Sequence, residues 1–308
     1  MKRLLKKLMS LFQEFGDKCH FFNPFDALVF TLSPYTRIGM ERKHEVILNK
    51  LEKGFMNQYT KVKSMPEAKC QDIGGDAPLW VCWLQGREQM PRLVDICVRS
   101  IERNAGVHPV NFISLGNLSK FVDIPSFVIQ KLNQGIISYT HFSDIIRMAL
   151  LNKYGGIWID ATIFVTSEIG EYNLPFYSIK QRTENKRFVE RGDKWTAYFI
   201  ASGKNNPVVN TIYRFFIYYW SEYNSMIDYF LVDYALALAY RNIPEFKEWI
   251  EWIPFDNEHV YEMFQNLNAP YSKDLEMKLF QQQFNKLSWK RKLNNGDTIG
   301  QSLLKINS

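Results

Sequence analysis

Cysteine is scarce in this sequence of 308 residues, and the four that occur form no CxxC pair and have no histidine at metal-ligand spacing. We therefore expect free thiols in a reducing compartment, and neither a disulfide framework nor a zinc site. Long apolar runs are also absent: the most apolar early stretch, residues 21–32, is shorter than the ~20 residues that span a bilayer, and no signal peptide precedes it. These absences predict a cytoplasmic protein.

Glycine-rich nucleotide motifs are missing too, because neither GxGxxG nor GxxxxGK(S/T) occurs. This excludes an ordinary dinucleotide-binding or P-loop enzyme. The formal net charge is only +6, from 38 basic and 32 acidic residues, and much of the excess lies at the two ends of the chain. Basic ends on a neutral body fit anionic lipid or phosphate ligands better than a nucleic acid, so we expect no nucleic-acid partner.

Apolar and aromatic residues are plentiful, at 46% and 15% of the sequence, which is enough to form a core and excludes disorder over most of the length. Residues 1–15 have leucine and phenylalanine at helical spacing on one side and Lys2, Arg3, Lys6 and Lys7 on the other, which predicts an amphipathic basic helix. Such a helix either lies on an anionic membrane surface or docks on the protein's own core.

The chain divides near Gly74, Gly75 and Pro78, which mark a break between a helical extension, residues 1–75, and the main domain, residues 76–308. In the main domain strands alternate with helices, which predicts an α/β fold with a mostly parallel, Rossmann-like sheet flanked by helices. The expected strands are 79–84, 110–115, 157–165 and 196–201, and the expected helices are 90–104, 127–134, 141–153, most of 207–242, 258–266 and 273–284.

The segment 141–165 is the most informative part of the sequence. In its expected strand side chains alternate between two faces: one face is wholly aliphatic, and the other has Trp158, Asp160 and Thr162 in a row. A carboxylate among hydrophobic residues is costly unless a cation or hydrogen-bond donors meet it. Asp160 is therefore expected beside a ligand at the edge of the sheet.

On the preceding helix Asp144 and Arg147 are three positions apart and share a face. They form either an exposed ion pair of little energetic consequence or, together with Asp160, part of a functional site. Gly155 and Gly156 are expected to end this helix, because glycine readily adopts a positive φ at a helix end.

The stretch SDIIRMALLNKYGGIWIDAT (143–162) resembles the core of the capsular polysaccharide synthesis proteins, which are similar to the Och1-like mannosyltransferases and, more distantly, to the clostridial glucosylating toxins. The segments PLWVCWLQG (78–86) and KLSWK (286–290) extend the resemblance over about residues 78–290. It implies a GT-A fold with helical N-terminal and C-terminal additions, a nucleotide-sugar donor and, in the better-known members, retention of anomeric configuration.

The resemblance also implies roles for single residues. Asp144 would bind ribose or sugar hydroxyls, Arg147 would reach the sugar and the diphosphate, and Trp158 stands where the family usually has tyrosine. The implied nucleotide-sugar site takes residues from three segments: Trp83, Gln85, Gly86, Asp144, Arg147, Trp158, Lys286, Ser288 and Trp289. For the segment that begins at Lys286, the alternative interpretation is a basic tail exposed to solvent.

A divalent cation, Mn²⁺ or Mg²⁺, is implied at Asp160, the first aspartate of the family's DxD motif. Thr162 replaces the second aspartate, and Asn285 stands nearest to the place of a C-terminal histidine ligand. Hydroxyl and amide oxygens are neutral and bind hard cations more weakly than carboxylates do. The sequence therefore leaves open whether a metal is needed.

The segment 228–233, DYFLVD, offers Asp228 and Asp233 as carboxylates that orient the acceptor, with helix capping or surface exposure as the alternative for each. The expected catalytic residues are thus Asp144, Arg147, Asp160 and Asp228.

Together these features predict a glycosyltransferase that moves a sugar, from a UDP-linked donor, onto a capsular or surface-polysaccharide intermediate. The acceptor is expected to be an oligosaccharide or a polyprenyl-linked sugar, and the enzyme is expected at the inner face of the cell membrane, held there by residues 1–15. A sugar-phosphate transferase, a non-catalytic or donor-hydrolysing nucleotide-sugar-binding protein, and an aromatic-rich RNA binder are the alternatives.

Overall fold

The computed structural model describes residues 2–32, 37–66, 69–180, 189 and 194–305. Its centre is a sheet of five strands in the order β2-β1-β3-β6-β5, and β1 pairs in parallel with β2 and β3 while β6 is antiparallel to β3 and β5. Four of these strands therefore run in one direction and β6 runs in the other. The strands are β1 (Leu79–Cys82), β2 (Val110–Ile113), β3 (Gly156–Ile159), β5 (Phe176–Ser178) and β6 (Phe199–Ser202).

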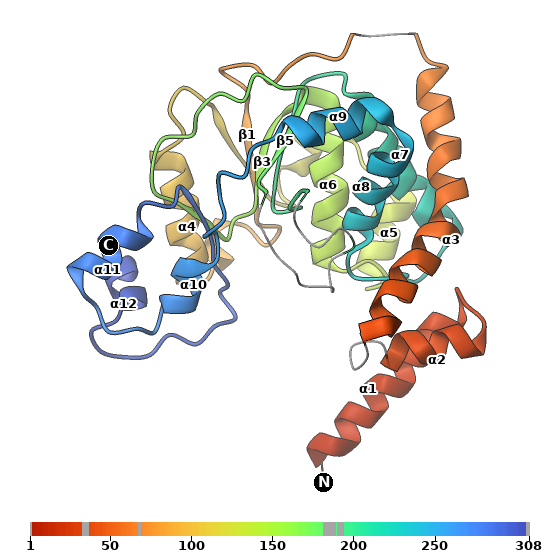
Figure 1. Cartoon of the computed structure of the whole chain (residues 1–308), viewed down its shortest axis with the longest axis horizontal. Coiled ribbons are helices and arrows are strands. Elements are labelled where there is room, and N and C mark those ends of the chain that lie inside the picture. The colour runs from red at the N-terminus through yellow and green to blue at the C-terminus, as the bar shows by residue number, and fades with distance from the viewer. Residues whose placement is uncertain (1, 33–36, 67–68, 181–188, 190–193, 306–308) are drawn as a thin grey trace.

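Helices cover both faces of this sheet (Figure 1). On one side lie α5 (Ser126–Asn133), α6 (Tyr139–Tyr154), α7 (Pro207–Glu222), α8 (Leu231–Asn242) and α9 (Pro244–Trp252). On the other side lie α4 (Arg92–Arg103) and the C-terminal helices α10 (Glu262–Asn266), α11 (Lys273–Leu279) and α12 (Ile299–Lys305). The predicted α/β class, a mostly parallel sheet flanked by helices, is confirmed.

The glycine pair after α6 explains how the chain turns from this helix into the sheet. Gly155 has φ 68° and its N–H bonds to the Leu151 carbonyl, so it ends the helix as predicted. Gly156 has φ 103°, and a Cβ there would lie 2.4 Å from the Pro78 carbonyl oxygen. Only glycine therefore lets β3 start directly beside β1.

The predicted strand 157–165 is wrong as a single element. The chain leaves the central sheet after Ile159 and turns through Asp160, whose carbonyl accepts a hydrogen bond from Ile163 N–H at 2.9 Å. The following residues form β4 (Ile163–Val165), which pairs antiparallel with β7 (Phe284–Lys286) in a separate sheet of two strands. The turn places the Asp160 carboxylate beside the Arg147 and Lys286 side chains.

β7 also corrects the predicted helix 273–284, because α11 ends at Leu279. Strands β5 and β7 have three residues each, and their hydrogen-bond partners are distant in sequence. Short strands of this kind give no periodic signal, whereas the longer predicted helices are present as α4, α5 and α6.

The N-terminal helices are α1 (Lys2–Cys19), α2 (Pro24–Leu32) and α3 (Arg37–Lys63). α3 packs against α7 and α8, with Leu48, Leu51 and Phe55 buried in the same core as the central sheet. α1 packs against α2 and extends away from the body (Figure 1). α1 includes residues 2–15 of the predicted N-terminal helix, and residue 1 lies outside the described residues. None of the described helices combines the length and apolarity needed to cross a bilayer.

Candidate active site

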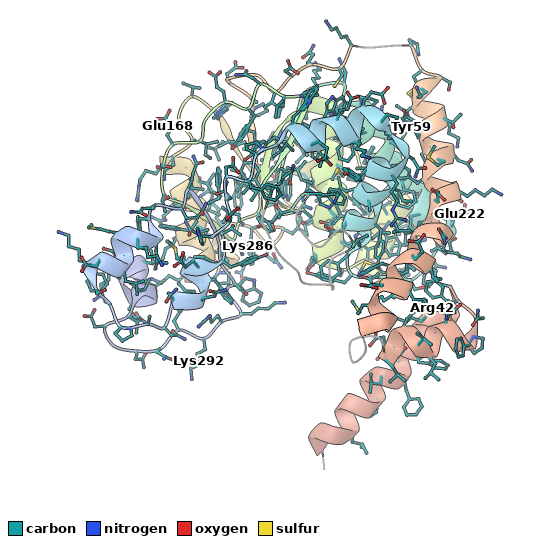
Figure 2. The ribbon with its side chains drawn as sticks, in the orientation of Figure 1. Arg42, Tyr59, Glu168, Glu222, Lys286 and Lys292 are labelled. Atoms are coloured by element: carbon teal, nitrogen blue, oxygen red, sulfur yellow. The ribbon has the colours of Figure 1, made fainter. Side chains whose placement is uncertain are left out.

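A cleft with two adjoining compartments lies between the α6–α8 side and the C-terminal segment, and Figure 2 shows Lys286 between these two halves of the molecule. The larger compartment has a volume of about 540 Å³ and the smaller one about 300 Å³. Both compartments share one wall, formed by Thr140, Asp144, Arg147, Asp160, Tyr229, Tyr261 and Lys286.

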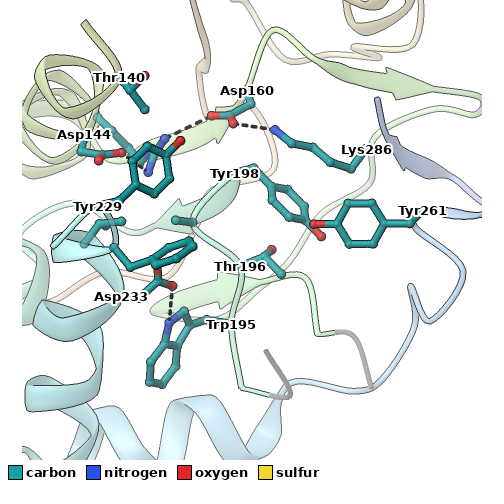
Figure 3. A pocket seen from close by; sticks show the side chains of 14 residues that line it. Thr140, Asp144, Asp160, Trp195, Thr196, Tyr198, Tyr229, Asp233, Tyr261 and Lys286 are labelled. Carbon is teal, nitrogen blue, oxygen red and sulfur yellow. Dashed lines mark hydrogen bonds and ion pairs between the residues drawn. The ribbon is translucent and has the colours of Figure 1, made fainter. Parts of the chain in front are cut away.

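A chain of four charged side chains forms this shared wall (Figure 3). Arg147 Nη1 lies 2.9 Å from Asp144 Oδ1, and Arg147 Nη2 donates to Asp160 Oδ1 at 3.1 Å. Lys286 Nζ donates to the other oxygen, Asp160 Oδ2, at 2.7 Å. Trp158 Nε1 adds a hydrogen bond to Asp160 Oδ1 at 2.9 Å. Residues predicted separately from the helix, the strand and the C-terminal segment thus meet in one network.

Burial decides between the two interpretations of the Asp144–Arg147 pair. The Asp144 and Arg147 side chains are only 9% and 4% exposed, so the exposed-pair interpretation is wrong. The Arg147 guanidinium also stacks over the Trp158 ring at 4.9 Å, and its Nε has no hydrogen-bond partner within the described residues. A buried cation with an unused donor at the edge of a cleft is suited to bind an anion.

Asp160 stays ionised in this setting. Burial alone would raise the pKa of its carboxyl, but the charges of Lys286 and Arg147 outweigh this effect, and the net pKa lies below its ordinary value. The ionised Asp160 carboxylate therefore holds Arg147 and Lys286 at the wall that both compartments share.

The larger compartment contains most of the residues expected to bind the nucleotide. Trp83, Gln85, Ser288 and Trp289 line it, and the Trp83 and Trp289 rings lie edge to face with their centroids 6.2 Å apart. Trp83 Nε1 is buried and has no hydrogen-bond partner within the described residues. Flat rings beside polar groups provide a surface on which a base can stack.

Three expected site residues lie elsewhere. Asp228 forms an ion pair with Lys43 Nζ at 2.5 Å and accepts from Phe230 N–H at 3.0 Å, so it ties α3 to the start of α8 and does not line the cleft. Asn285 is fully buried on the opposite face of β7 from Lys286, and its Nδ2 donates to the Gln282 carbonyl at 2.7 Å. Gly86 provides the turn after Gln85, with φ 89°, and does not line either compartment.

The arrangement around Asp160 and Thr162 does not fit a divalent cation. Lys286 Nζ lies 2.7 Å from Asp160 Oδ2 and 2.8 Å from Thr162 Oγ1, so it already binds both oxygens expected to hold the metal. Among the described residues no three His, Cys, Asp or Glu side chains come together as a metal-binding group. A divalent cation at these two oxygens would have to displace the Lys286 ammonium group.

The smaller compartment contains aromatic residues that the sequence did not single out, Trp195, Tyr198 and Tyr229, together with Asp233. Trp195 Nε1 donates to Asp233 Oδ1 at 3.2 Å (Figure 3). Burial and then the negative charge of Asp144 raise the pKa of Asp233 to about 7. Of the two carboxylates in the segment 228–233, only Asp233 reaches the cleft.

Comparison with known proteins gives one family. A family model described as "Capsular polysaccharide synthesis protein" matches residues 30–306. Among solved structures, the chain is similar to one titled "PaToxG Glycosyltransferase", with 16% sequence identity and a TM-score of 0.41, over 68% of this chain and 81% of that chain. No curated protein matches the chain.

Proposed function

The chain belongs to the capsular polysaccharide synthesis family, and from this premise we propose that it is a glycosyltransferase that moves a sugar from a nucleotide-sugar donor to a capsular or surface-polysaccharide intermediate. The observation that supports this most is the shared wall of the cleft. It places two cations, Arg147 and Lys286, between the larger compartment, which Trp83 and Trp289 line, and the smaller one, which Asp233 lines. A nucleotide sugar has the same order of parts: base, diphosphate and sugar.

In this proposal the nucleoside lies in the larger compartment, beside Trp83 and Trp289, and the diphosphate lies against Arg147 and Lys286. When the bond between the sugar C1 and the diphosphate oxygen breaks, the diphosphate leaves with the electron pair and gains negative charge. Arg147 and Lys286 are fixed in place before this happens, so they stabilise the developing charge with little reorganisation. The acceptor hydroxyl oxygen forms the new bond to C1, and its proton passes to the leaving diphosphate oxygen.

The transferred sugar would occupy the smaller compartment. Asp144 and Asp233 supply oxygens for its hydroxyl groups, and Tyr229, 61% exposed at the entrance, offers a ring for its apolar face. Sites that bind hydroxyl groups through buried polar side chains discriminate strongly between epimers, because a misplaced hydroxyl leaves them unpaired. A UDP-linked donor and retention of anomeric configuration complete the proposal on the basis of the family resemblance.

Membrane contact through the N-terminal helices is part of the same proposal. α1 exposes a stripe of Leu5, Met9 and Phe12, at 60%, 66% and 74%, and the sequence places four basic residues in its first two turns. α2 exposes a second stripe: Phe25, Leu28 and Leu32. Apolar stripes with nearby positive charge suit the surface of an anionic membrane, and a polyprenyl-linked acceptor would be found there.

A donor panel tests the function directly. The purified chain is incubated with UDP-, GDP- and CMP-linked sugars, with and without a lipid-linked acceptor, and the released nucleotide is identified. Glycosyl transfer from UDP- or GDP-sugars releases a nucleoside diphosphate, whereas phosphosugar transfer from them releases a nucleoside monophosphate. Release of the monophosphate from these donors would support the sugar-phosphate transferase, and no turnover of any donor would support the non-catalytic binding protein.

A further inference from the structure

Lys286 occupies the place where the DxD resemblance implies a divalent cation. Its Nζ bridges Asp160 Oδ2 and Thr162 Oγ1, at 2.7 and 2.8 Å, and also lies 4.8 Å from the centre of the Tyr198 ring. The side chain is 19% exposed, so it reaches the cleft while most of its stem is covered by protein. A lysine in this position is a fixed positive charge beside the proposed diphosphate site.

The backbone holds Lys286 in this place. It is the last residue of β7 and pairs with Ile163 of β4, directly after the turn that carries Asp160 and Thr162. The next residue, Leu287, donates from its N–H to the Thr162 carbonyl at 2.9 Å, and Lys286 N–H donates to the Val260 carbonyl at 2.7 Å. The ammonium group is therefore positioned by two strands and not by a flexible tail, so the basic-tail interpretation does not hold for Lys286.

The charges at the shared wall are already balanced. Asp144 and Asp160 contribute two negative charges, and Arg147 and Lys286 contribute two positive ones. Asp160 Oδ1 accepts from both Trp158 and Arg147, and Oδ2 accepts from Lys286, so each oxygen of this carboxylate is in use. A divalent cation would need to displace the ammonium group from Asp160 Oδ2 and Thr162 Oγ1 before it could bind there.

We propose that Lys286 takes the role of the divalent cation, binding the diphosphate of the donor through its ammonium group, and that donor binding and transfer need no metal ion. The inference rests on the proposed function, because it assigns part of the nucleotide-sugar site. When the diphosphate binds, Lys286 can donate one hydrogen bond to it while keeping its hydrogen bond to Asp160, since an ammonium group has three donors. Its single charge is smaller than that of Mn²⁺, and Arg147 adds the second.

Calorimetric titration with UDP, GDP, ADP and CDP, each in EDTA and again in Mn²⁺, tests the inference without relying on turnover. We expect at least one nucleoside diphosphate to bind with a dissociation constant that differs less than threefold between the two conditions. Lys286→Met keeps the stem that packs against Tyr198 and should weaken this binding at least tenfold. Lys286→Arg should restore much of it, because it restores the charge. Lys292→Met, which removes an exposed lysine from the same segment, is the matched control and should bind as the wild type does.

The failure of the inference and that of the proposed function are distinct outcomes. Binding that is at least tenfold tighter in Mn²⁺ than in EDTA, or unchanged binding by Lys286→Met, would overturn the role of Lys286 and leave a nucleotide site in place. No binding of any nucleoside diphosphate in either condition would overturn the proposed function, and the role of Lys286 with it. Melting curves of each variant show that the protein tested is folded.

Discussion

Trp195 Nε1 donates a hydrogen bond to Asp233 Oδ1 over 3.2 Å, and this contact joins the chain just before β6 to the first turn of α8 inside the cleft. Burial and then the charge of Asp144 raise the pKa of Asp233 from 3.8 to about 7. The native state therefore keeps the Asp233 proton up to about neutral pH, whereas the unfolded chain releases it near pH 4. Across this window the native state binds more protons, so its free energy of unfolding falls as the pH rises.

Asp233→Asn should remove this loss of stability, because an amide resembles the protonated carboxyl and cannot ionise. We expect the melting temperature of the wild type to fall relative to that of the variant as the pH rises from about 5 to about 8, through the raised pKa. Asp274→Asn, at an exposed carboxylate on α11, serves as the control, and its melting temperature should change with pH in parallel with that of the wild type. If the melting temperature of Asp233→Asn also changed in parallel with the wild type, Asp233 would not titrate in this range.

Arg147→Lys should lower donor turnover by about 10²–10³, since the compact ammonium group of lysine cannot reproduce the separate contacts that Nη1 and Nη2 make to Asp144 and Asp160. Lysine is preferable to alanine here, because alanine would remove the cation that pairs with the buried Asp144 carboxylate, at a cost of about 3–5 kcal/mol. The control is Arg99→Lys, at an exposed pair with Asp95 on α4, where activity should stay within twofold of the wild type. Steady-state kinetics measure the turnover of each variant, and melting curves measure its stability. A loss of turnover below about threefold for Arg147→Lys would mean that the Asp144–Arg147 pair has a structural role only.

Trp289→Ala should raise the dissociation constant of the bound nucleoside diphosphate by about tenfold, because stacking of a base on an aromatic ring contributes about 1–3 kcal/mol. Trp289 is 45% exposed, so the fold does not depend on its ring. Trp252→Ala removes a tryptophan that is 59% exposed and lies outside both compartments, and it should bind as the wild type does. If calorimetry gave the two variants equal affinities for the nucleoside diphosphate, the base would not stack on Trp289.

The double substitution Thr162→Asp with Lys286→Ala should create a metal site. It replaces the neutral hydroxyl with a second carboxylate and removes the ammonium group that now binds both oxygens. In electron paramagnetic resonance the signal of free Mn²⁺ should decrease when this variant is added, and it should stay unchanged with the wild type. A decrease of equal size with the wild type would mean that Mn²⁺ already binds beside Lys286.

The sequence predicted those parts of the molecule that depend on local patterns. The helix with Asp144 and Arg147, the glycine pair and the starts of the strands near residues 79 and 157 all have their signals within a few consecutive residues. The turn at Asp160 could not be predicted this way, because a run of apolar residues continues through it and the strand that pairs with residues 163–165 is distant in the sequence.

The placement of the cleft residues depended on tertiary contacts in the same way. Asp228 and Asp233 look alike in the sequence, yet Lys43 on α3 binds the first and Trp195 the second. Asn285 and Lys286 are neighbours on one strand, and the alternation of side chains sends only Lys286 to the cleft. The three-residue length of β7 gave no pattern from which this alternation could be predicted.

Met9→Gln with Phe12→Gln tests whether α1 binds membranes. Both side chains are largely exposed, at 66% and 74%, so their replacement should leave the melting temperature within about 2 °C of the wild type. Burial of a methionine or phenylalanine side chain in an apolar environment contributes about 1.5–3 kcal/mol, so the two substitutions together should lower co-sedimentation with anionic liposomes at least tenfold.

The control is Val107→Gln, which replaces an equally exposed apolar residue on the body of the protein and should sediment as the wild type does. Hydrolysis of a soluble donor should be the same for all three proteins, because α1 extends away from the cleft. Undiminished co-sedimentation of the double variant would mean that the exposed stripe of α1 meets another partner.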